Sequence, residues 1–353
     1  MLTSLYIAST QGSGGKTTIA VGLCLALRGR GYKVGYFKPV GTLAAPSGGT
    51  VLDEDAAFVA GLLGLTDDPT DICPVVLDEE ALHDVLSGSE VDAMARVEAA
   101  YGRIAAGKDI VVCEGLGEIW QGRFLRTSGA DVVRRLDLAT LLVGKFAGAR
   151  LLDDIIYVKD ALKEHLLGVL FNMVPETRLK VVRHEYTAFL EKHGVPSYGV
   201  LPSNTRLAAV SVDEIVEALS GAYVCGEEHG QRLVETYLIG AMSPEHALRY
   251  FQLTPNKVVI VGGDRAEIVL TALDTPTTAV VLTGDFVPSP AVLERAEEAG
   301  VPLISVECDT VTAADGLRRL FGRLRVKEPA KIDLIVGLID ECVDLDRLIA
   351  DLS

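Results

Sequence analysis

A glycine-rich run near the start of the chain combines a lysine and a threonine in a spacing suited to anion binding. Residues 10–17 read Thr10-Gln11-Gly12-Ser13-Gly14-Gly15-Lys16-Thr17, between a short apolar run and a helical pattern. Backbone N–H groups of such a turn, with a helix N-terminus behind them, form a cradle for phosphate. In that arrangement Lys16 would reach the terminal phosphates, and the hydroxyl of Thr17 would bind Mg²⁺.

The run departs from the strict pattern G-x-x-x-x-G-K-[ST], because Thr10 stands where that pattern has its first glycine. The alternative is a glycine-rich turn followed by an ordinary helix. The joint presence of strand, loop, Lys-Thr pair and helix favours nucleotide binding, with ATP or GTP as the ligand and Mg²⁺ as its cofactor. The expected nucleotide contacts in this run are Gly12, Ser13, Gly14, Gly15, Lys16, Thr17 and Thr18.

A second lysine follows the second apolar run. Lys38 stands directly before Pro39, which ends the strand, so Lys38 is expected at the sheet edge where the phosphates would lie. We expect Lys16 and Lys38 to be the catalytic cations if the protein transfers phosphoryl groups. The alternative for Lys38 is a solvated lysine at a strand end.

Two carboxylates complete a possible magnesium site together with Thr17. Asp55 opens a helical pattern after a glycine-rich loop, and Glu114 ends the apolar run Ile110–Cys113. Mg²⁺ prefers a few carboxylates, phosphate oxygens and waters. For Asp55 the alternative is a simple helix N-cap.

These residues must be positioned by an alternation of strands and helices. Such alternation predicts an α/β fold with a parallel sheet, helices on both faces, and ligands at the carboxyl ends of the strands. The expected strands are Leu5–Ala8, Val34–Phe37, Ile110–Cys113, Leu141–Val143, Val169–Phe171 and Tyr198–Leu201. The expected helices include Thr17–Arg28, Glu90–Ala106 and Arg178–His193.

A second, smaller α/β domain is expected after residue 211. The predicted domains are 1–211, 212–330 and a C-terminal amphipathic helix within 331–353, from about Ile332 to Leu348. Expected helices of the second domain are Val212–Leu219, a stretch around Arg232–Leu238, Ala266–Leu273, Ala291–Ala299 and Ala313–Phe321. Its expected strands are Val258–Val261, Ala279–Leu282 and Leu303–Val306.

Two turns of the second domain are candidates for a second ligand site. Gly262-Gly263-Asp264-Arg265 and Thr283-Gly284 end two adjacent predicted strands, so they would converge at one sheet edge. The alternative is that the glycines serve tight turns and Asp264 caps a helix.

Composition limits the classes of partner. A formal net charge of -16 argues against nucleic acid and anionic membranes, because both are polyanions. The six cysteines lie far apart, which favours free thiols. With no signal-peptide pattern and no long apolar run, a cytoplasmic protein is expected.

Residues 1 to about 210 resemble dethiobiotin synthetase and its relatives, including cobyrinic acid a,c-diamide synthase and the N-terminal domain of long phosphotransacetylases. The matching segments are 9–17, Tyr36–Val40, Glu54–Ala56, Glu114–Gly117 and Gly168–Asn172. The resemblance implies that Lys16, Thr17 and Lys38 contact phosphate or metal, that Asp55 and Glu114 hold Mg²⁺, and that Asn172 reads the base. Glu118 stands where the synthetase has a glycine beside its substrate carboxylate, so we expect no dethiobiotin synthesis.

From about Met242 to Arg325 the chain resembles the DRTGG domain, although Asp285 replaces the final glycine. The two resemblances imply an ATP- or GTP-binding regulatory protein linked to phosphotransacetylase-type acetyl metabolism. They also imply ligand sensing or subunit contact by the DRTGG domain, and a homodimer. Asp264, Arg265, Thr283 and Gly284 are the candidate residues for an effector there, although the carboxylate of Asp285 speaks against an anion. The alternative is an ATP-dependent ligase that acts on a small carboxylate.

Overall fold

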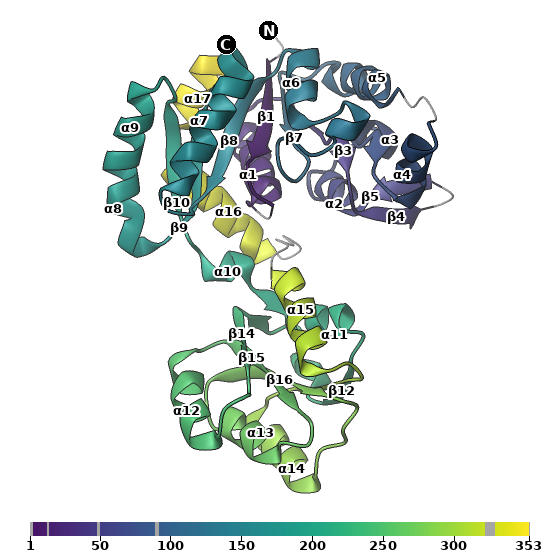
Figure 1. Cartoon of the computed structure of the whole chain (residues 1–353), viewed down its shortest axis with the longest axis vertical. Coiled ribbons are helices and arrows are strands. Elements are labelled where there is room, and N and C mark those ends of the chain that lie inside the picture. Colours follow the sequence, from purple (N-terminus) through teal and green to yellow (C-terminus); the bar gives the residue numbers. More distant parts are fainter. Residues whose placement is uncertain (1–2, 13, 48–49, 89–91, 322–328, 353) are drawn as a thin grey trace. The chain divides into compact units, whose positions relative to one another are not determined.

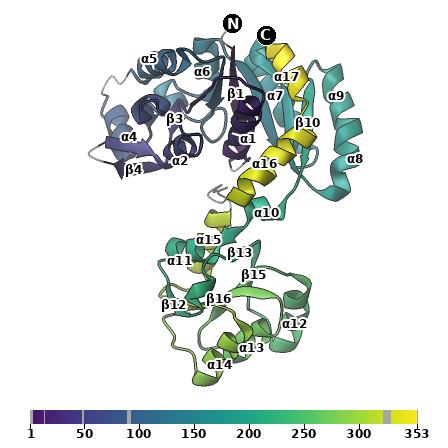
Figure 2. The same cartoon turned by 180° about the vertical axis from the view of Figure 1, so that it is seen from behind.

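The chain forms two compact units in the computed structural model, which describes residues 3–12, 14–47, 50–88, 92–321 and 329–352. Unit 1 comprises Met1–Ser203 and Val326–Ser353, and unit 2 comprises Asn204–Arg325. Figures 1 and 2 show the elements of both from opposite sides. The end of the chain, which we expected as a separate segment 331–353, therefore belongs to unit 1.

Six parallel strands form the main sheet of unit 1, in the order β10-β9-β8-β1-β7-β2. They are β1 (Thr3–Ser9), β2 (Val34–Phe37), β7 (Ile110–Glu114), β8 (Ala139–Lys145), β9 (Leu166–Val174) and β10 (Ser197–Pro202). The expected α/β fold is confirmed. Because β1 lies between β7 and β8, its glycine-rich turn stands beside Glu114, which ends β7.

Helices pack on the sheet of unit 1, and two short strand pairs lie beside it (Figure 1). The helices are α1 (Lys16–Gly29), α2 (Glu54–Leu62), α3 (Pro69–Ile72), α4 (Glu79–Leu86), α5 (Ala93–Ala105), α6 (Gly129–Leu136), α7 (Arg150–Leu162), α8 (Leu179–Val181), α9 (Thr187–Lys192), α16 (Pro329–Cys342) and α17 (Leu345–Leu352). The pairs are β3 (Val40–Gly41) with β6 (Val75–Val76), and β4 (Ala44–Ser47) with β5 (Thr50–Asp53).

The helix α16 lies against α1, the helix that follows the glycine-rich turn; Figures 1 and 2 both show the two side by side. Gly22 makes this close approach possible. A methyl group on Gly22 would stand 2.6 Å from Ile339 and 2.7 Å from Ile335, and both isoleucines are buried. The C-terminal helix thus completes the core of unit 1.

The single helix expected from Ile332 to Leu348 is wrong, because α16 and α17 are separate helices. Between them, the N–H of Asp344 donates to the carbonyl of Tyr198 at 2.8 Å, and Val343 bridges to Gly199. The edge strand β10 therefore takes up the backbone groups that would otherwise continue the helix.

Two other expected helices differ from the structure. The stretch 178–193 is not one α-helix: α8 and α9 flank a π-helical turn, Val182–Tyr186. The helix expected from Glu90 begins at Ala93, where Asp92 accepts the N–H of Ala95 at 3.0 Å; residues 90 and 91 lie outside the described residues.

Unit 2 contains a five-stranded sheet in the order β12-β17-β16-β15-β14, parallel except for β12. Its strands are β12 (Ala222–Cys225), β14 (Thr236–Ile239), β15 (Lys257–Gly262), β16 (Thr277–Thr283) and β17 (Leu303–Val306), with a separate pair β11 (Val210–Ser211) and β13 (Leu233–Val234). Its helices are α10 (Thr205–Ala208), α11 (Val212–Ala218), α12 (Pro244–Leu253), α13 (Ala266–Leu273), α14 (Pro290–Ala299) and α15 (Thr310–Phe321).

The helix expected around Arg232–Leu238 is wrong, because this stretch forms β13 and β14. Its aromatic and β-branched residues suit a strand, and β14 pairs with β15 along its whole length. Strands of two and four residues are too short to show the alternation by which a strand is recognised in a sequence.

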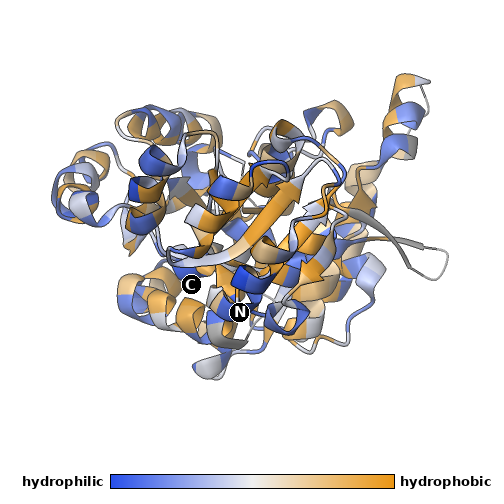
Figure 3. Cartoon of the chain, turned by 90° about the horizontal axis from the view of Figure 1, so that it is seen from below, coloured by the Kyte–Doolittle hydropathy of each residue, from blue (hydrophilic) through white to orange (hydrophobic). Residues whose placement is uncertain are grey.

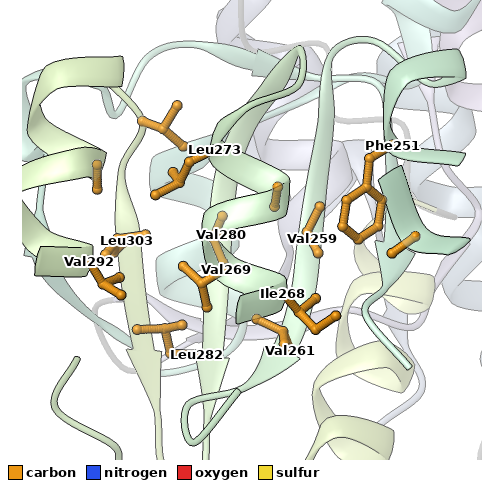
Figure 4. Close-up of a cluster of buried hydrophobic side chains, with 14 residues drawn as sticks. Phe251, Val259, Val261, Ile268, Val269, Leu273, Val280, Leu282, Val292 and Leu303 are labelled. Atoms are coloured by element: carbon orange, nitrogen blue, oxygen red, sulfur yellow. The ribbon is translucent and has the colours of Figure 1, made fainter. Parts of the chain in front are cut away.

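Apolar layers cover both faces of the sheet of unit 2. Val259 and Val261 belong to one buried cluster, drawn in Figure 4, and Val258 and Ile260 belong to the other. This alternation follows from the two-residue period of a strand. In Figure 3 the strands are coloured mainly hydrophobic, whereas the helices carry both colours.

Candidate functional site at the glycine-rich turn

The glycine-rich turn closes around small residues at the carboxyl end of β1. Gly15 has a φ of 84° and precedes the first turn of α1, so a side chain there would be strained. A methyl on Gly14 would stand 2.5 Å from Ser9 Oγ, and one on Gly15 would stand 2.5 Å from Asn172 Nδ2. The backbone is therefore kept bare where phosphate oxygens would approach.

Two further residues of the turn, Gly12 and Ser13, were expected to contact the nucleotide. A methyl on Gly12 would have no neighbour within 4 Å among the residues that the structure describes. The remaining expected contact, Ser13, lies outside the described residues.

Lys16 opens α1, and its side chain is buried. Its ammonium donates a hydrogen bond to the carbonyl of Gly117, in the loop that follows β7. Burial lowers the pKa of Lys16, and Lys38 lowers it further, whereas the carboxylates of Glu114 and Glu118 act in the opposite direction. Lys16 is thus close enough to both acids and to Lys38 for their charges to act on it.

Thr17 and Glu114, both expected at a magnesium site, are in direct contact. Thr17 Oγ1 donates to Glu114 Oε1 at 2.6 Å, and the hydroxyl of Tyr36 donates to Glu114 Oε2 at 2.7 Å. Burial, followed by the charge of Glu114, raises the pKa of Tyr36, so its hydroxyl stays protonated and donates. Sequence reasoning missed Tyr36; its signal was a tyrosine in β2, the strand that pairs with β7.

Lys38 is buried, so the alternative of a solvated strand-end lysine is wrong. Its ammonium lies 2.7 Å from Asp53 Oδ1 and 3.4 Å from Asp55 Oδ2. Burial alone would lower the pKa of Lys38, but the charges of Glu114, Asp53 and Asp55 outweigh burial and raise it. Lys38 therefore carries its charge inside a cluster of three carboxylates.

Asp53 is the residue of this cluster that sequence reasoning missed. Its carboxylate accepts the N–H groups of Thr42 at 3.0 Å, Leu43 at 3.1 Å and Ala56 at 2.9 Å. Asp53 rather than Asp55 is therefore the N-cap of α2, which overturns the N-cap alternative for Asp55. Its signal was an acidic residue three positions before the first buried residue of a helix.

Asp55 remains available for other contacts, since its side chain is 39% exposed. Burial raises its pKa, Lys38 opposes this effect, and Glu114 adds to it. Among the described residues, no group of three or more His, Cys, Asp or Glu side chains could hold a metal by itself. The donors here suit Mg²⁺ that also takes phosphate oxygens and waters.

The polar side chains of Thr18 and Asn172 differ in their hydrogen bonding. The hydroxyl of Thr18 is buried and has no hydrogen-bond partner in the described part of the chain. The amide of Asn172 donates to the carbonyl of Gly14 at 2.9 Å and accepts the N–H of Met173 at 2.9 Å. Asn172 thus holds the glycine-rich turn, whereas the Thr18 hydroxyl has no acceptor within the described residues.

The candidate residues of unit 2 lie together, as Gly262 pairs with Thr283 in the β15–β16 ladder. Their polar groups are used within the unit: Arg265 donates to the carbonyls of Gly240 and Met242, and Thr283 Oγ1 lies 2.9 Å from Thr310 Oγ1.

The backbone of the turn at Gly284 also makes hydrogen bonds within unit 2. The N–H of Gly284 is shared between the carbonyls of Val306 and Cys308. Asp264 does not cap α13, which begins without a side-chain cap. The two turns therefore lie side by side, as expected, but most of their hydrogen-bond donors are already bound to acceptors within unit 2.

Comparison with known families matches almost the whole chain. The model described as "AAA domain" matches residues 3–211, and the model of the DRTGG domain matches residues 214–320. The phosphate acetyltransferase of Synechocystis sp. is 25% identical over 368 residues, which cover 99% of this chain and 52% of that protein. The phosphate acetyltransferase of Pseudomonas aeruginosa is 25% identical over 378 residues, 98% of this chain and 51% of that protein. The chain spans about half the length of these curated relatives.

Solved structures give more distant similarities. The CBS and DRTGG domains of the regulatory region of Clostridium perfringens pyrophosphatase, complexed with diadenosine tetraphosphate, show 20% identity and a TM-score of 0.29 over 46% of this chain and 77% of that one. Cobyrinic acid a,c-diamide synthase of Mycobacterium smegmatis, with ADP and magnesium, shows 16% identity and a TM-score of 0.38 over 58% and 88%. Because the first family model covers more than half of its residues, this chain belongs to the AAA domain family, and its AAA domain is followed by a DRTGG domain.

Proposed function

We propose that this protein binds ATP or GTP with Mg²⁺ on the turn 10–18 and serves as a regulatory nucleotide-binding module. The observation that carries the proposal is the hydrogen bond between Thr17 Oγ1 and Glu114 Oε1, 2.6 Å long, at the end of the β1–β7 pair. It joins a hydroxyl in the first turn of α1 and a strand-end carboxylate, the two kinds of group that a phosphate-bound Mg²⁺ would take from the protein.

Two further features support a phosphate ligand. The buried hydroxyl of Thr18 has no acceptor among the described residues, whereas buried donors normally have one, and a phosphate oxygen would supply it. The bare backbone of Gly14 and Gly15 lies beside it, at the N-terminus of a 14-residue helix.

In this proposal Thr17, Glu114 and Asp55 hold Mg²⁺, and Lys16 binds the terminal phosphates. Mg²⁺, when bound, neutralises phosphate charge and orients the phosphate chain. Glu114 is kept oriented by Tyr36, and Lys38 is kept beside Asp55 by Asp53. Glu114 and Asp55 therefore each contact a side chain outside the expected metal shell, Tyr36 and Lys38 respectively.

The charge balance around Lys38 favours regulation over the ligase alternative. A ligase needs cationic groups free to stabilise a transferring phosphoryl group. Here the ammonium of Lys38 is already paired with Asp53 and Asp55. The curated relatives are phosphate acetyltransferases, so we propose that nucleotide bound here regulates acetyl-group metabolism of that type.

Thermal unfolding of the full chain with and without nucleotide tests this proposal. A ligand at 100 times its Kd adds about 2.7 kcal/mol to the free energy of unfolding of the state that binds it. We expect ATP or GTP to raise the melting temperature with Mg²⁺ and much less with EDTA. Equal melting temperatures in all these conditions would rule the proposal out.

A further inference from the structure

The ammonium of Lys16 is occupied by its own protein. It donates to the carbonyl of Gly117, in the loop 115–121 that follows Glu114. We propose that this loop competes with nucleotide for Lys16, through the carbonyl of Gly117 and the charge of Glu118, and opens when a terminal phosphate displaces them. This inference rests on the proposed function and adds a regulatory device to the same site.

The loop is built as a closed turn. The N–H of Glu118 donates to Gln121 Oε1 at 3.0 Å, the N–H of Gln121 donates to the carbonyl of Glu118 at 2.9 Å, and Trp120 Nε1 donates to Glu118 Oε2 at 2.8 Å. A methyl on Gly117 would stand 1.7 Å from Gln121 Oε1, so a side chain there would displace the Gln121 amide from the N–H of Glu118. The closed turn presents the carbonyl of Gly117 to Lys16.

The loop is also tied to β1. The N–H of Gly115 donates to the carbonyl of Ile7 at 2.9 Å, and the N–H of Ile119 donates to the carbonyl of Ser9 at 2.8 Å. The loop is therefore anchored to the strand that leads into the glycine-rich turn. A change at Lys16 reaches the loop directly, without passing through another element.

Charge gives the direction of the change. The carboxylate of Glu118 acts on Lys16 as a nearby negative charge. A triphosphate brings further negative charges to the same ammonium, so it draws Lys16 from Gly117 and repels Glu118. A diphosphate, with less charge at its end, should open the loop less than a triphosphate.

The chain carries a reporter on this loop. Trp120 is the one tryptophan of the sequence, and its side chain is 45% exposed. Opening would break its hydrogen bond to Glu118 and change its surroundings. Intrinsic fluorescence therefore reads the loop without any label.

The first test compares the full chain without nucleotide, with Mg-ADP and with Mg-ATP. Binding is measured by calorimetry, and the loop by Trp120 emission and by hydrogen exchange of the peptide spanning 115–121. We expect Mg-ATP to change the emission and to speed exchange of this peptide at least fivefold. Lys16→Met without nucleotide should show the same open loop, whereas Lys33→Met, at an exposed position, should not.

The second test removes the competing charge. Glu118→Gln keeps an oxygen that can accept from Trp120, so the turn remains and the charge is lost. We expect Mg-ATP to bind about three- to tenfold more tightly. Glu164→Gln, at an exposed position elsewhere in unit 1, should leave the affinity unchanged.

The outcomes separate this inference from the proposed function. Mg-ATP binding without any change in the loop, or unchanged affinity in Glu118→Gln, would overturn the competition and leave nucleotide binding intact. Absence of binding would overturn the proposed function. In that case Lys16→Met still decides whether Lys16 holds the loop: an unchanged loop in this variant contradicts the inference.

Discussion

At the scale of single residues, Glu114 receives hydrogen bonds on both of its oxygens, from Thr17 and from Tyr36. The motif and strand pattern of the sequence were enough to bring Lys16, Thr17 and Glu114 to one sheet edge. Tyr36 and Asp53 were not predicted, because their roles depend on strand register and on a turn that no motif describes. Sequence patterns therefore predicted the residues expected to contact a ligand, but not Tyr36 and Asp53, which orient them.

Tyr36→Phe tests this orienting role. Removing the hydroxyl leaves a buried carboxylate oxygen without its donor, which should cost about 1–2 kcal/mol of unfolding free energy. We expect Mg-nucleotide to bind several-fold more weakly. Tyr198→Phe is the matched control, because it breaks a 2.7 Å bond to Asp351 in the same unit away from the turn. Equal effects of both variants on nucleotide affinity would argue against a specific role of Tyr36.

We expect Lys257 in β15 to make the stability of unit 2 depend on pH. Its side chain is buried beside Thr275 Oγ1 and the carbonyl of Pro276, and burial lowers its pKa to about 8. A lowered folded pKa means that the charged form destabilises the folded state below pH 8, and that this cost disappears as the pH rises towards 10.5.

Lys257→Met should therefore stabilise unit 2 by about 1–2 kcal/mol at pH 7. Its advantage over the parent protein should shrink by pH 10, where Lys257 is neutral in the folded state. Chemical denaturation at both pH values measures the difference. A constant difference between the two proteins at both pH values would show that Lys257 does not titrate as expected.

At the scale of elements, the pairing of α16 with α1 depends on Gly22. Apolar runs predicted the central strands because buried parallel strands are apolar throughout. The same patterns could not show that a C-terminal helix packs on the first helix of the chain, since packing partners far apart in sequence leave no local period. The π-helical turn in the stretch 178–193 was not predicted either, because a single π-helical turn inside a helix has no sequence pattern of its own.

Gly22→Ala should destabilise unit 1 by about 1–3 kcal/mol, because the added methyl would meet Ile335 and Ile339. Alanine favours a helix over glycine by about 1 kcal/mol, so the clash must outweigh this gain. Gly29→Ala, in the same helix with no neighbour within 4 Å, is the control and should be neutral or stabilising. Urea unfolding decides it: if Gly22→Ala matches Gly29→Ala, the packing described for α16 is incorrect.

At the scale of the whole molecule, the chain leaves unit 1, forms unit 2 and returns to unit 1. We expect a homodimer that involves unit 2, where Tyr250 and Leu253 of α12 expose apolar surface. Light scattering on the full chain should give twice the mass of the 353-residue chain. A monomer at micromolar concentration would contradict this expectation.

None of the described helices is long and apolar enough to cross a membrane.

Titration calorimetry of Lys16→Ala beside the parent protein tests the central claim most directly. In the proposed site Lys16 would place its charge beside the terminal phosphates, and Lys16→Ala removes none of the buried apolar side chains of unit 1. We expect the parent protein to bind Mg-ATP or Mg-GTP, and the variant, folded to the same extent by circular dichroism, to bind at least 100-fold more weakly. If the variant binds as tightly as the parent protein, the turn 10–18 is not the nucleotide site.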